Sequence, residues 1–164
     1  MPRRRARAAA LALLAAAAGC GYGLTTRYVA RGGAERIHVR AFENRSTEPE
    51  LGATLTAALR DALARRGADA GPGASAFIEG EVRATEPASS SPGGGGQPAP
   101  TWRLAVEVRA RLHVAGAPAE ERVVRREADF LAGADPLESE GRRALALRRV
   151  VEDAAAEILR SFEQ

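Results

Sequence analysis

The chain has 164 residues and a mass of 17.2 kDa, which leaves room for one domain. All 24 basic residues are arginine, against 21 acidic residues. Four of those arginines lie within the first seven residues. Without them the balance is 20 basic to 21 acidic, which argues against nucleic-acid binding because such binding depends on clustered positive charge. After residue 20 no stretch approaches the roughly 18 apolar residues of a membrane-spanning helix.

The apolar content is low for a folded domain. From Cys20 onward, Leu, Val, Ile and Phe account for 29 of 145 residues. This share lies near the level of about 20% below which highly charged chains tend to be disordered, but the net charge here is small. We therefore expect a folded domain of modest stability that gains from an anchor or a partner.

Residues 1–19 have the three parts of a secretory signal. A positively charged start precedes an apolar run of Ala and Leu over residues 8–18, which is too short to span a bilayer. Ala17-Ala18-Gly19-Cys20 resembles the lipoprotein box, in which the cysteine is acylated and becomes the first mature residue. Cys20 is the only cysteine, so no disulfide can form within the chain. The alternative is a plain secretory signal with an incidental cysteine.

The resemblance to lipoproteins implies a membrane anchor at Cys20. One acyl chain binds membranes only marginally, whereas two or more hold a protein firmly. Gly21, rather than Asp, follows the cysteine. By analogy with lipoprotein sorting this favours the outer membrane, on its periplasmic side.

The first half of the mature chain predicts a tether, a strand and a helix. Residues 20–34 are rich in Gly and polar residues and predict a tether. Over 36–41, apolar and polar residues alternate, as in a half-buried strand. Residues 42–47 predict a turn, with Thr47 or Glu48 capping the next helix. That helix is indicated by apolar residues at helical spacing and ends at Gly67, which suits a left-handed cap: Leu51, Leu55, Ala58, Leu59, Ala62 and Leu63.

The second half predicts further strands and a long helix. Residues 76–85 predict a strand, whereas the Ser-, Gly- and Pro-rich segment 86–100 predicts a flexible loop. Strict alternation over 102–114 predicts a long strand, and residues 121–131 a returning antiparallel strand. Asp135-Pro136 predicts a cap and a first-turn proline, opening a helix to about Phe162. The apolar stripe of this helix, which predicts its core face, consists of Leu147, Val151, Ala154, Ile158 and Phe162.

Together these elements predict an α+β fold. We expect a two-layer sandwich in which two helices pack on one face of a roughly four-stranded mixed sheet, in the order β-α-β-β-β-α. The domain is expected to span residues 35–164.

The polar residues do not suggest catalysis or metal binding. His38 and His113 lie 75 residues apart, without a cysteine or a paired histidine at ligand spacing, so no metal or other cofactor is expected. The serines at 89–91 lie in the predicted loop, without a base held near them. We therefore expect no enzyme.

The order of several motifs resembles that of the LPS-assembly lipoprotein family, LptE. The motifs are Cys20-Gly21-Tyr22-x-Leu24, Ala41-Phe42-Glu43-Asn44-Arg45-Ser46, Glu48-Pro49, Leu55-Thr56-x-Ala58-Leu59, Arg66-Gly67 and Asp135-Pro136 before a long helix. The resemblance covers essentially the whole mature chain. It implies a lipoprotein that plugs the LptD barrel of the outer membrane, supports its assembly and delivers lipopolysaccharide to the cell surface, with direct lipopolysaccharide contact.

The resemblance also suggests binding residues. Family members contact lipopolysaccharide through basic residues in the loop before the long strand and early in the last helix. The first part of this pattern fails here, because residues 86–100 contain no basic residue and Arg103 is the nearest candidate. The second part indicates Arg142 and Arg143. Arginine suits phosphates because its planar fork binds them bidentately. For Arg142 and Arg143 the alternative is a solvated helix face. Residues expected to face the barrel partner are Phe42, Asn44, Arg45, Arg109 and Arg111.

Simpler roles remain open for these partner-facing residues. Asn44 and Ser46 alone could shape a tight turn before the helix. Arg103, Arg109 and Arg111 could form a ladder of ion pairs with Glu79 and Glu81 of the preceding strand. A different function is also open, namely a lipid-anchored regulator or secretion-pore subunit of the curli-secretion or penicillin-binding-protein-activator type. Those proteins share the strand, the Phe-x-Asn-Arg-Ser/Thr segment and the helix, but usually have a longer domain.

Overall fold

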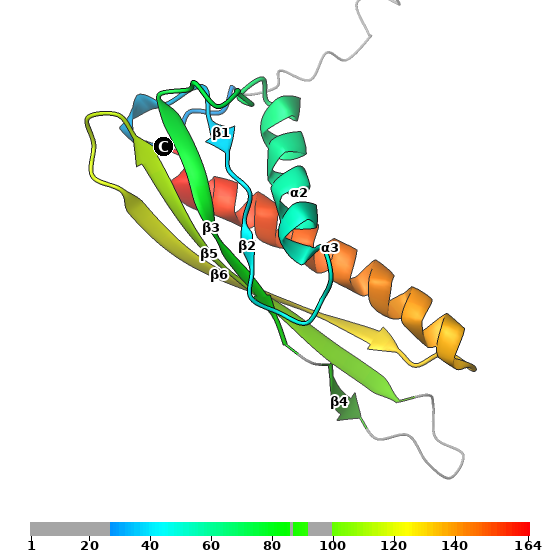
Figure 1. Cartoon of the computed structure of the whole chain (residues 1–164). Helices are drawn as coiled ribbons and strands as arrows, with labels where there is room; N and C mark the ends of the chain where they lie inside the picture. Colours follow the sequence, from blue (N-terminus) through cyan, green and yellow to red (C-terminus); the bar gives the residue numbers. More distant parts are fainter. Residues whose placement is uncertain (1–26, 86, 92–99) are drawn as a thin grey trace, which may run out of the picture.

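The computed structural model describes residues 27–85, 87–91 and 100–164 (Figure 1). Its elements follow one another as η1 (Arg31–Gly33), β1 (His38–Val39), β2 (Glu43–Asn44), α2 (Leu51–Arg65), β3 (Ala76–Ala84), β4 (Ala88–Ser91), β5 (Thr101–Val114), β6 (Glu120–Leu131) and α3 (Pro136–Phe162). None of the described helices is long and apolar enough to cross a membrane.

All six strands belong to one mixed sheet built around β5. β3, β4 and β6 run antiparallel to β5, whereas the short strands β1 and β2 run parallel to β3. β2, α2 and β3 thus form a β-α-β unit whose two strands are neighbours. The predicted long strand is confirmed as β5, and its returning partner as β6.

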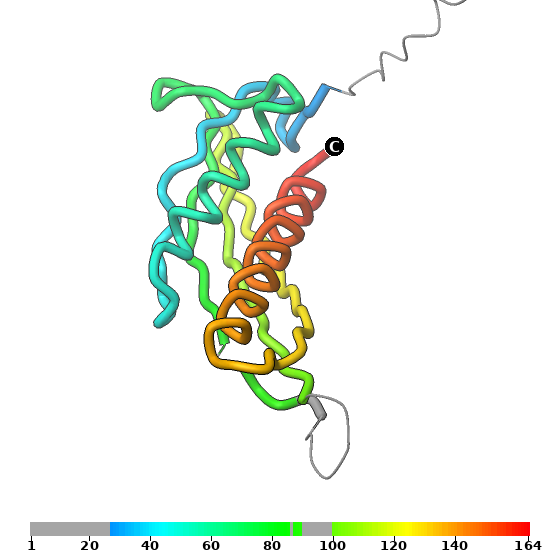
Figure 2. The backbone as a smooth tube through the Cα atoms, turned by 90° about the vertical axis from the view of Figure 1, so that its right-hand side faces the viewer, coloured from blue at the N-terminus to red at the C-terminus, as the bar shows by residue number. Residues whose placement is uncertain are grey.

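Both helices cover the same face of the sheet. Figure 2 shows α2 and α3 side by side over the strands, and neither of these helices lies on the other face of the sheet. The expected α+β architecture of two layers is therefore confirmed. α3 is much longer than α2, so only α3 covers the end of the sheet where β5 begins and β6 ends (Figure 1).

One hydrophobic core lies between the layers. Alternate residues of β3 and β5 point into it, and the predicted stripes of both helices meet them. The largest fully buried side chains include Tyr28, Ile37, Leu55, Leu59, Ile78, Ile158 and Phe162. Gly52 lets α2 approach the preceding segment closely, since a Cβ atom there would lie 2.4 Å from the Phe42 carbonyl oxygen. Gly67 has a φ of +67° after α2, as predicted.

The folded domain begins before the predicted boundary. The Tyr28 side chain is fully buried, and its hydroxyl donates to the Leu159 carbonyl oxygen at 2.9 Å. Ala30 forms a bridge with Glu163, next to the C-terminus. The prediction that the whole of 20–34 is a tether is therefore wrong for residues 28–34, because one buried aromatic residue holds this segment on the domain.

The start of α2 also differs from the prediction. The N-cap is Glu50, with a φ of 59° and no side-chain cap, rather than Thr47 or Glu48. The predicted turn over 42–47 is partly strand, because β2 pairs with β3 at Glu43 and Asn44. Between β1 and β2 the chain has one residue more than β3 opposite, and this bulge separates the two short strands.

Part of the segment 86–100 is a strand. Ala88–Ser91 forms β4, which pairs with the first residues of β5. The prediction of a loop throughout this segment is therefore wrong. A long β5 offers backbone partners that outweigh the low strand propensity of serine. Residues 86 and 92–99 lie outside the described part.

Candidate functional site

The open face of the sheet is a lattice of opposite charges. It carries arginines and acidic residues from four strands and the β1–β2 segment, and most of them are ion-paired: Arg40, Glu43, Glu79, Glu81, Arg83, Arg103, Arg109, Arg111, Glu121, Arg125, Glu127 and Asp129. Charged and apolar residues alternate along β3 and β5, so the charged side chains of these two strands point away from the core.

The arginines of β5 pair with β6 rather than with β3. Arg103 donates to both carboxylate oxygens of Asp129, at 2.7 and 3.1 Å, and Arg111 donates to Glu121 at 2.6 Å. The hydrogen bond from Arg103 lowers the pKa of the Asp129 carboxyl below its ordinary value. Arg109 lies 3.9 Å from Glu121.

The predicted ladder with Glu79 and Glu81 therefore has the wrong partners. Both glutamates do lie opposite Arg111 and Arg109 in the register of β3 and β5. Glu79, however, accepts a hydrogen bond from Arg40 at 2.8 Å. Glu81 is engaged by other arginines, because it lies 3.6 Å from Arg45 and 3.2 Å from Arg83. Competition among arginines thus turns the β5 side chains toward β6.

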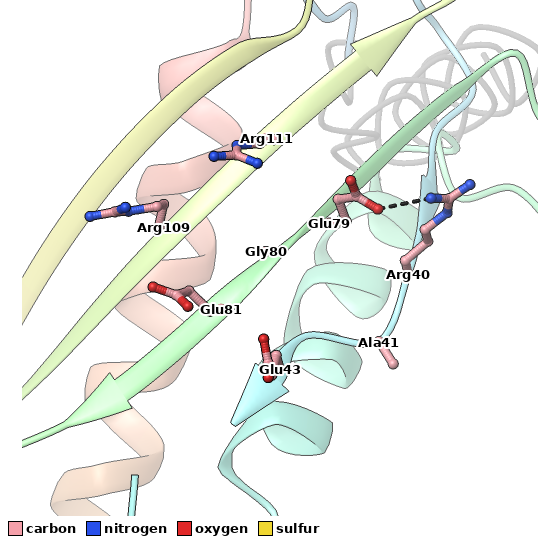
Figure 3. A pocket seen from close by; sticks show the side chains of 8 residues that line it. All are labelled: Arg40, Ala41, Glu43, Glu79, Gly80, Glu81, Arg109 and Arg111. Carbon is pink, nitrogen blue, oxygen red and sulfur yellow. Dashed lines mark hydrogen bonds and ion pairs between the residues drawn. The ribbon is translucent and has the colours of Figure 1, made fainter. Parts of the chain in front are cut away.

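A depression of about 340 Å³ lies on this face, where β1 and β2 separate (Figure 3). Its lining is polar and carries three arginines and three glutamates, around Ala41 and Gly80: Arg40, Arg109, Arg111, Glu43, Glu79 and Glu81. Such a surface can exchange ion pairs with a charged partner. A small anion would have to displace a glutamate from each arginine that it approached.

Residues 42–46 are fixed by contacts within the domain, either in the core or with neighbouring residues. Phe42 was expected to face a partner, but the structure buries it in the core with 5% of its surface exposed. Asn44 shapes the turn, as the simpler alternative held: its side chain accepts from the Ser46 amide and hydroxyl and donates to the Glu48 carbonyl oxygen. Arg45 is exposed and lies 3.0 Å from Glu43.

Arg142 and Arg143 lie next to each other in the first turns of α3, and each has its own partners. Asp135 caps this helix, as predicted, by accepting from the Glu138 amide at 2.8 Å. Arg142 donates to Glu138 at 2.5 Å and to the Ala132 carbonyl oxygen at 3.0 Å. The Ala134 amide and Arg142 together lower the pKa of Glu138. The hydrogen bonds from Arg142 to Ala132 and from the Ala134 amide to Glu138 join the segment after β6 to the start of α3.

Arg143 makes a partly buried ion pair. It contacts Glu48, before α2, and also Glu140, at 3.0 Å. The Arg143 side chain is 23% exposed and that of Glu48 15%. A purely solvated helix face is therefore wrong for Arg143. Arg103 lies at the same end of the molecule but on the open face of the sheet, so the structure does not bring all three predicted contacts onto one surface.

The same end of the molecule exposes large apolar side chains. Among the described residues, three of the four exposed large hydrophobic residues lie here: Leu131, Leu137 and Leu145, at 50%, 83% and 54%. Trp102 is half-buried and lines a shallow depression with Phe130 and Pro136. We call this region, where β6 ends and α3 begins, the distal end.

Two further predictions concern acylation of Cys20 and the absence of a metal site. Cys20 lies outside the described residues. Within residues 27–85, 87–91 and 100–164, no group of three or more His, Cys, Asp or Glu side chains is placed to hold a metal ion.

A model of the LptE family, described as lipopolysaccharide-assembly, matches residues 34–162. The chain belongs to the LptE family. This confirms the resemblance suggested by the motifs, and the match covers nearly the whole described domain. A search of curated proteins found no match to the chain.

Solved structures share the LptE-like fold at low sequence identity. A putative lipoprotein from Caulobacter crescentus has a TM-score of 0.56 at 18% identity, covering 77% of this chain and 86% of its own. The rare lipoprotein B from Shewanella oneidensis has a TM-score of 0.57 at 17% identity, covering 76% and 92%. Protein XCC0632 from Xanthomonas campestris has a TM-score of 0.50 at 10% identity, covering 84% and 85%.

Sequence reasoning about this LptE-family chain missed the exposed leucines of the distal end. Leu131 ends an alternating strand, and Leu137 and Leu145 lie eight residues apart on one helix. A signal was present, because neither leucine belongs to the stripe of Leu147, Val151, Ala154, Ile158 and Phe162 that predicted the core face. Apolar residues outside the core stripe mark candidates for binding.

Proposed function

We propose that this LptE-family protein is an outer-membrane lipoprotein that acts as the plug and assembly partner of an LptD-type barrel in lipopolysaccharide delivery. It is attached on the periplasmic side through acyl chains on Cys20. The observation that carries the proposal is the family match over residues 34–162. The proposed role is binding and not catalysis.

The charged open face of the sheet suits contact with the barrel. Arg45, Arg109 and Arg111 have their side chains on this face, and Asn44 lies beside it in the short strand β2. Because these arginines have acidic neighbours, a polar and hydrated inner surface of the barrel can cover this face without burying an unpaired charge. Binding that is restricted to the folded form would also stabilise a lean core.

The distal end suits contact with lipopolysaccharide, which presents phosphates beside acyl chains. Arg142 and Arg143 supply planar cationic forks, and the exposed side chain of Leu137 supplies apolar surface. Arg103 would contribute from the adjoining face.

The anchor is tested by mass spectrometry of the mature protein. An acylated cysteine at position 20 as the first residue is the expected result. A free thiol at Cys20 would exclude the anchor.

The partnership is tested by isolating the tagged protein from detergent-solubilised outer membranes. We expect an LptD-type barrel in a one-to-one ratio. Recovery of a secretion pore or a penicillin-binding protein in its place would favour the alternative class of anchored regulator.

The lipopolysaccharide contact is tested with the double variant Arg142→Gln, Arg143→Gln. Binding of purified lipopolysaccharide should weaken while barrel recovery persists. The matched control is Arg65→Gln, Arg148→Gln, which removes the same charge from exposed arginines on the helix layer. Arg143 pairs with both Glu48 and Glu140, so the variant Glu48→Gln removes one of its two carboxylate partners and should strengthen binding. Equal binding by all four proteins would contradict the assignment.

A further inference from the structure

β6 forms a free edge of the sheet. It pairs with β5 on one side, and no described strand pairs with its other side. The Ala132 amide donates to the Pro100 carbonyl oxygen at 3.0 Å, which continues the ladder between the two strands. In an antiparallel ladder, the N–H and C=O of one residue point to the same side and alternate along the strand. Even-numbered residues of β6 therefore face β5, and odd-numbered residues face outward.

The first half of this edge is covered by side chains. Arg122 donates to the outward carbonyl oxygen of Glu121 at 2.8 Å, and Arg126 donates to that of Arg125 at 3.2 Å. Arg126 is also fixed from α3 by Glu157, at 3.0 Å. Charged side chains of this kind are a usual protection of exposed strand edges against pairing.

The second half lacks such cover. Within the described part of the chain, no hydrogen bond reaches the outward backbone groups of Glu127, Asp129 or Leu131. Side chains thus cover the outward carbonyl oxygens of Glu121 and Arg125, whereas no hydrogen bond covers the outward groups over 127–131 in the described chain. Leu131, at the end of this second half, is 50% exposed.

An apolar groove runs beside the open half of the edge. It lies between β6 and α3 and has a volume of about 350 Å³. We call it the β6–α3 groove. Its apolar lining comes from Ala128, Phe130, Leu131, Leu145 and Ala146. A strand edge beside a helix-lined groove is the arrangement by which sheets accept extended peptides.

The free charge of the groove is positive. Arg142 and Arg149 lie along α3, and Asp129 on β6. Asp129 is bound by Arg103, and Arg142 by Glu138. Within the described residues Arg149 has no ion pair. An incoming segment with an acidic side chain would therefore find a partner there.

We propose that β6 accepts an extended polypeptide segment of a partner protein along residues 127–131. The segment adds a strand to the sheet, places alternate apolar side chains in the β6–α3 groove and sets an acidic group against Arg149. The outward N–H and C=O groups select a polypeptide over an acyl chain, which offers neither donor nor acceptor there. A second copy of this chain fits less well, because Asp129 and Glu127 are already paired and bring no free acid to Arg149.

This proposal rests on the proposed function in one respect, that the segment belongs to the barrel subunit. Its test uses the full-length, membrane-anchored protein with variants at one position. Asp129→Pro removes an outward N–H that the ladder with β5 does not use, so the sheet tolerates it. Asp129→Asn keeps the N–H and removes only the charge. Val123→Pro makes the same backbone change in the covered half.

We expect Asp129→Pro to lower barrel recovery from solubilised membranes about tenfold, since it removes a backbone hydrogen bond and obstructs the neighbouring strand. Asp129→Asn, which removes one charge of the open face, and Val123→Pro should each lower barrel recovery much less than Asp129→Pro does. Leu145→Glu, in the groove, should lower recovery as well. In the purified complex, the amides of Asp129 and Leu131 should exchange hydrogen at least about tenfold more slowly than in the free protein, whereas that of Val123 should not change.

Other results overturn the proposal. Equal recovery by Asp129→Pro and the parent, or equal losses for Asp129→Pro and Asp129→Asn, would exclude strand addition. A dimer of the full chain in detergent that Asp129→Pro dissociates would assign the edge to a second copy. Binding to phosphatidylglycerol vesicles that Leu145→Glu abolishes and Asp129→Pro does not would assign the groove to a lipid. If the parent protein recovers no barrel, the proposed function fails along with this inference. Equal barrel recovery by all variants defeats this inference alone.

Discussion

The two ends of the molecule are built in opposite ways. At the end that holds both described termini, Tyr28 and Phe162 are fully buried, and Arg66 pairs with Glu163 at 3.0 Å. At the distal end, Leu137 is 83% exposed and Leu145 54% exposed. The same strand β5 runs through both ends. The difference therefore comes from what covers the sheet and not from the sheet itself.

The unequal helix lengths explain this difference. α2 has 15 residues and α3 has 27, so the sheet is covered by two helices at one end and by one at the other (Figure 1). A region with less burial has less stabilisation to lose, and binding surfaces are commonly drawn from such regions. Stability is thus concentrated near the termini, and surface open to partners near the start of α3.

The largest expected effect on stability separates the two ends directly. Phe162→Ala should lower the free energy of unfolding by about 3–5 kcal/mol, because it empties a fully buried aromatic site. Leu137→Ala, the matched truncation at the exposed end, should change it by less than about 0.5 kcal/mol. Urea unfolding followed by circular dichroism measures both. Similar losses for the two variants would contradict the proposed division.

A smaller effect concerns Tyr28. Tyr28→Phe should cost about 1–2 kcal/mol at pH 7, because the buried Leu159 carbonyl oxygen loses its hydroxyl donor. Burial, together with the charge of Glu163, raises the pKa of Tyr28 above its ordinary value near 10, and Arg66 opposes this. The neutral phenol thus contributes stability that is present below about pH 10 and is lost as the pH rises through the raised pKa.

Unfolding measured between pH 7 and 11 checks this linkage. The parent protein should lose stability above about pH 10, whereas Tyr28→Phe should lose less over the same interval. Tyrosinate absorbance gives an independent reading, since the buried phenol should ionise only above its ordinary pKa. Parallel pH profiles for the two proteins would mean that Tyr28 is not the group responsible.

The smallest of the three effects is expected at the start of α3. Asp135→Ala should lower the free energy of unfolding by about 1 kcal/mol, because the Glu138 amide loses its cap. Hydrogen exchange should quicken in the first turn of α3 and stay unchanged near Phe162. A uniform change along the helix would show that its two ends are not independent.

Much of the fold could be predicted from residue pattern. The alternation along β5 and the stripe ending at Phe162 each gave the right element and the right buried face, because period and burial are directly linked. The cap at Asp135 was also recognisable from its sequence. The architecture then followed from two helices that each have one apolar face.

Features that depend on distant partners could not be predicted in this way. β4 forms because β5 is long enough to pair with it, and the N-cap of α2 is Glu50, two or three residues beyond the expected caps. The assignment of Phe42 to a surface failed because the bulge between β1 and β2 turns it inward. The choice of Glu121 over Glu79 by Arg111 required knowing that Arg40 already holds Glu79.

The junction of the two termini has a practical consequence for labelling. The Gln164 amide donates to the Val29 carbonyl oxygen at 3.1 Å, so any tag appended after Gln164 begins beside residue 29. Nine residues separate that point from Cys20, a reach of at most ~30 Å. A C-terminal fluorophore would therefore report on the neighbourhood of the lipid attachment that we propose at Cys20. A dye meant to sense engagement of a partner should instead be placed near Leu137, on the opposite side of the domain.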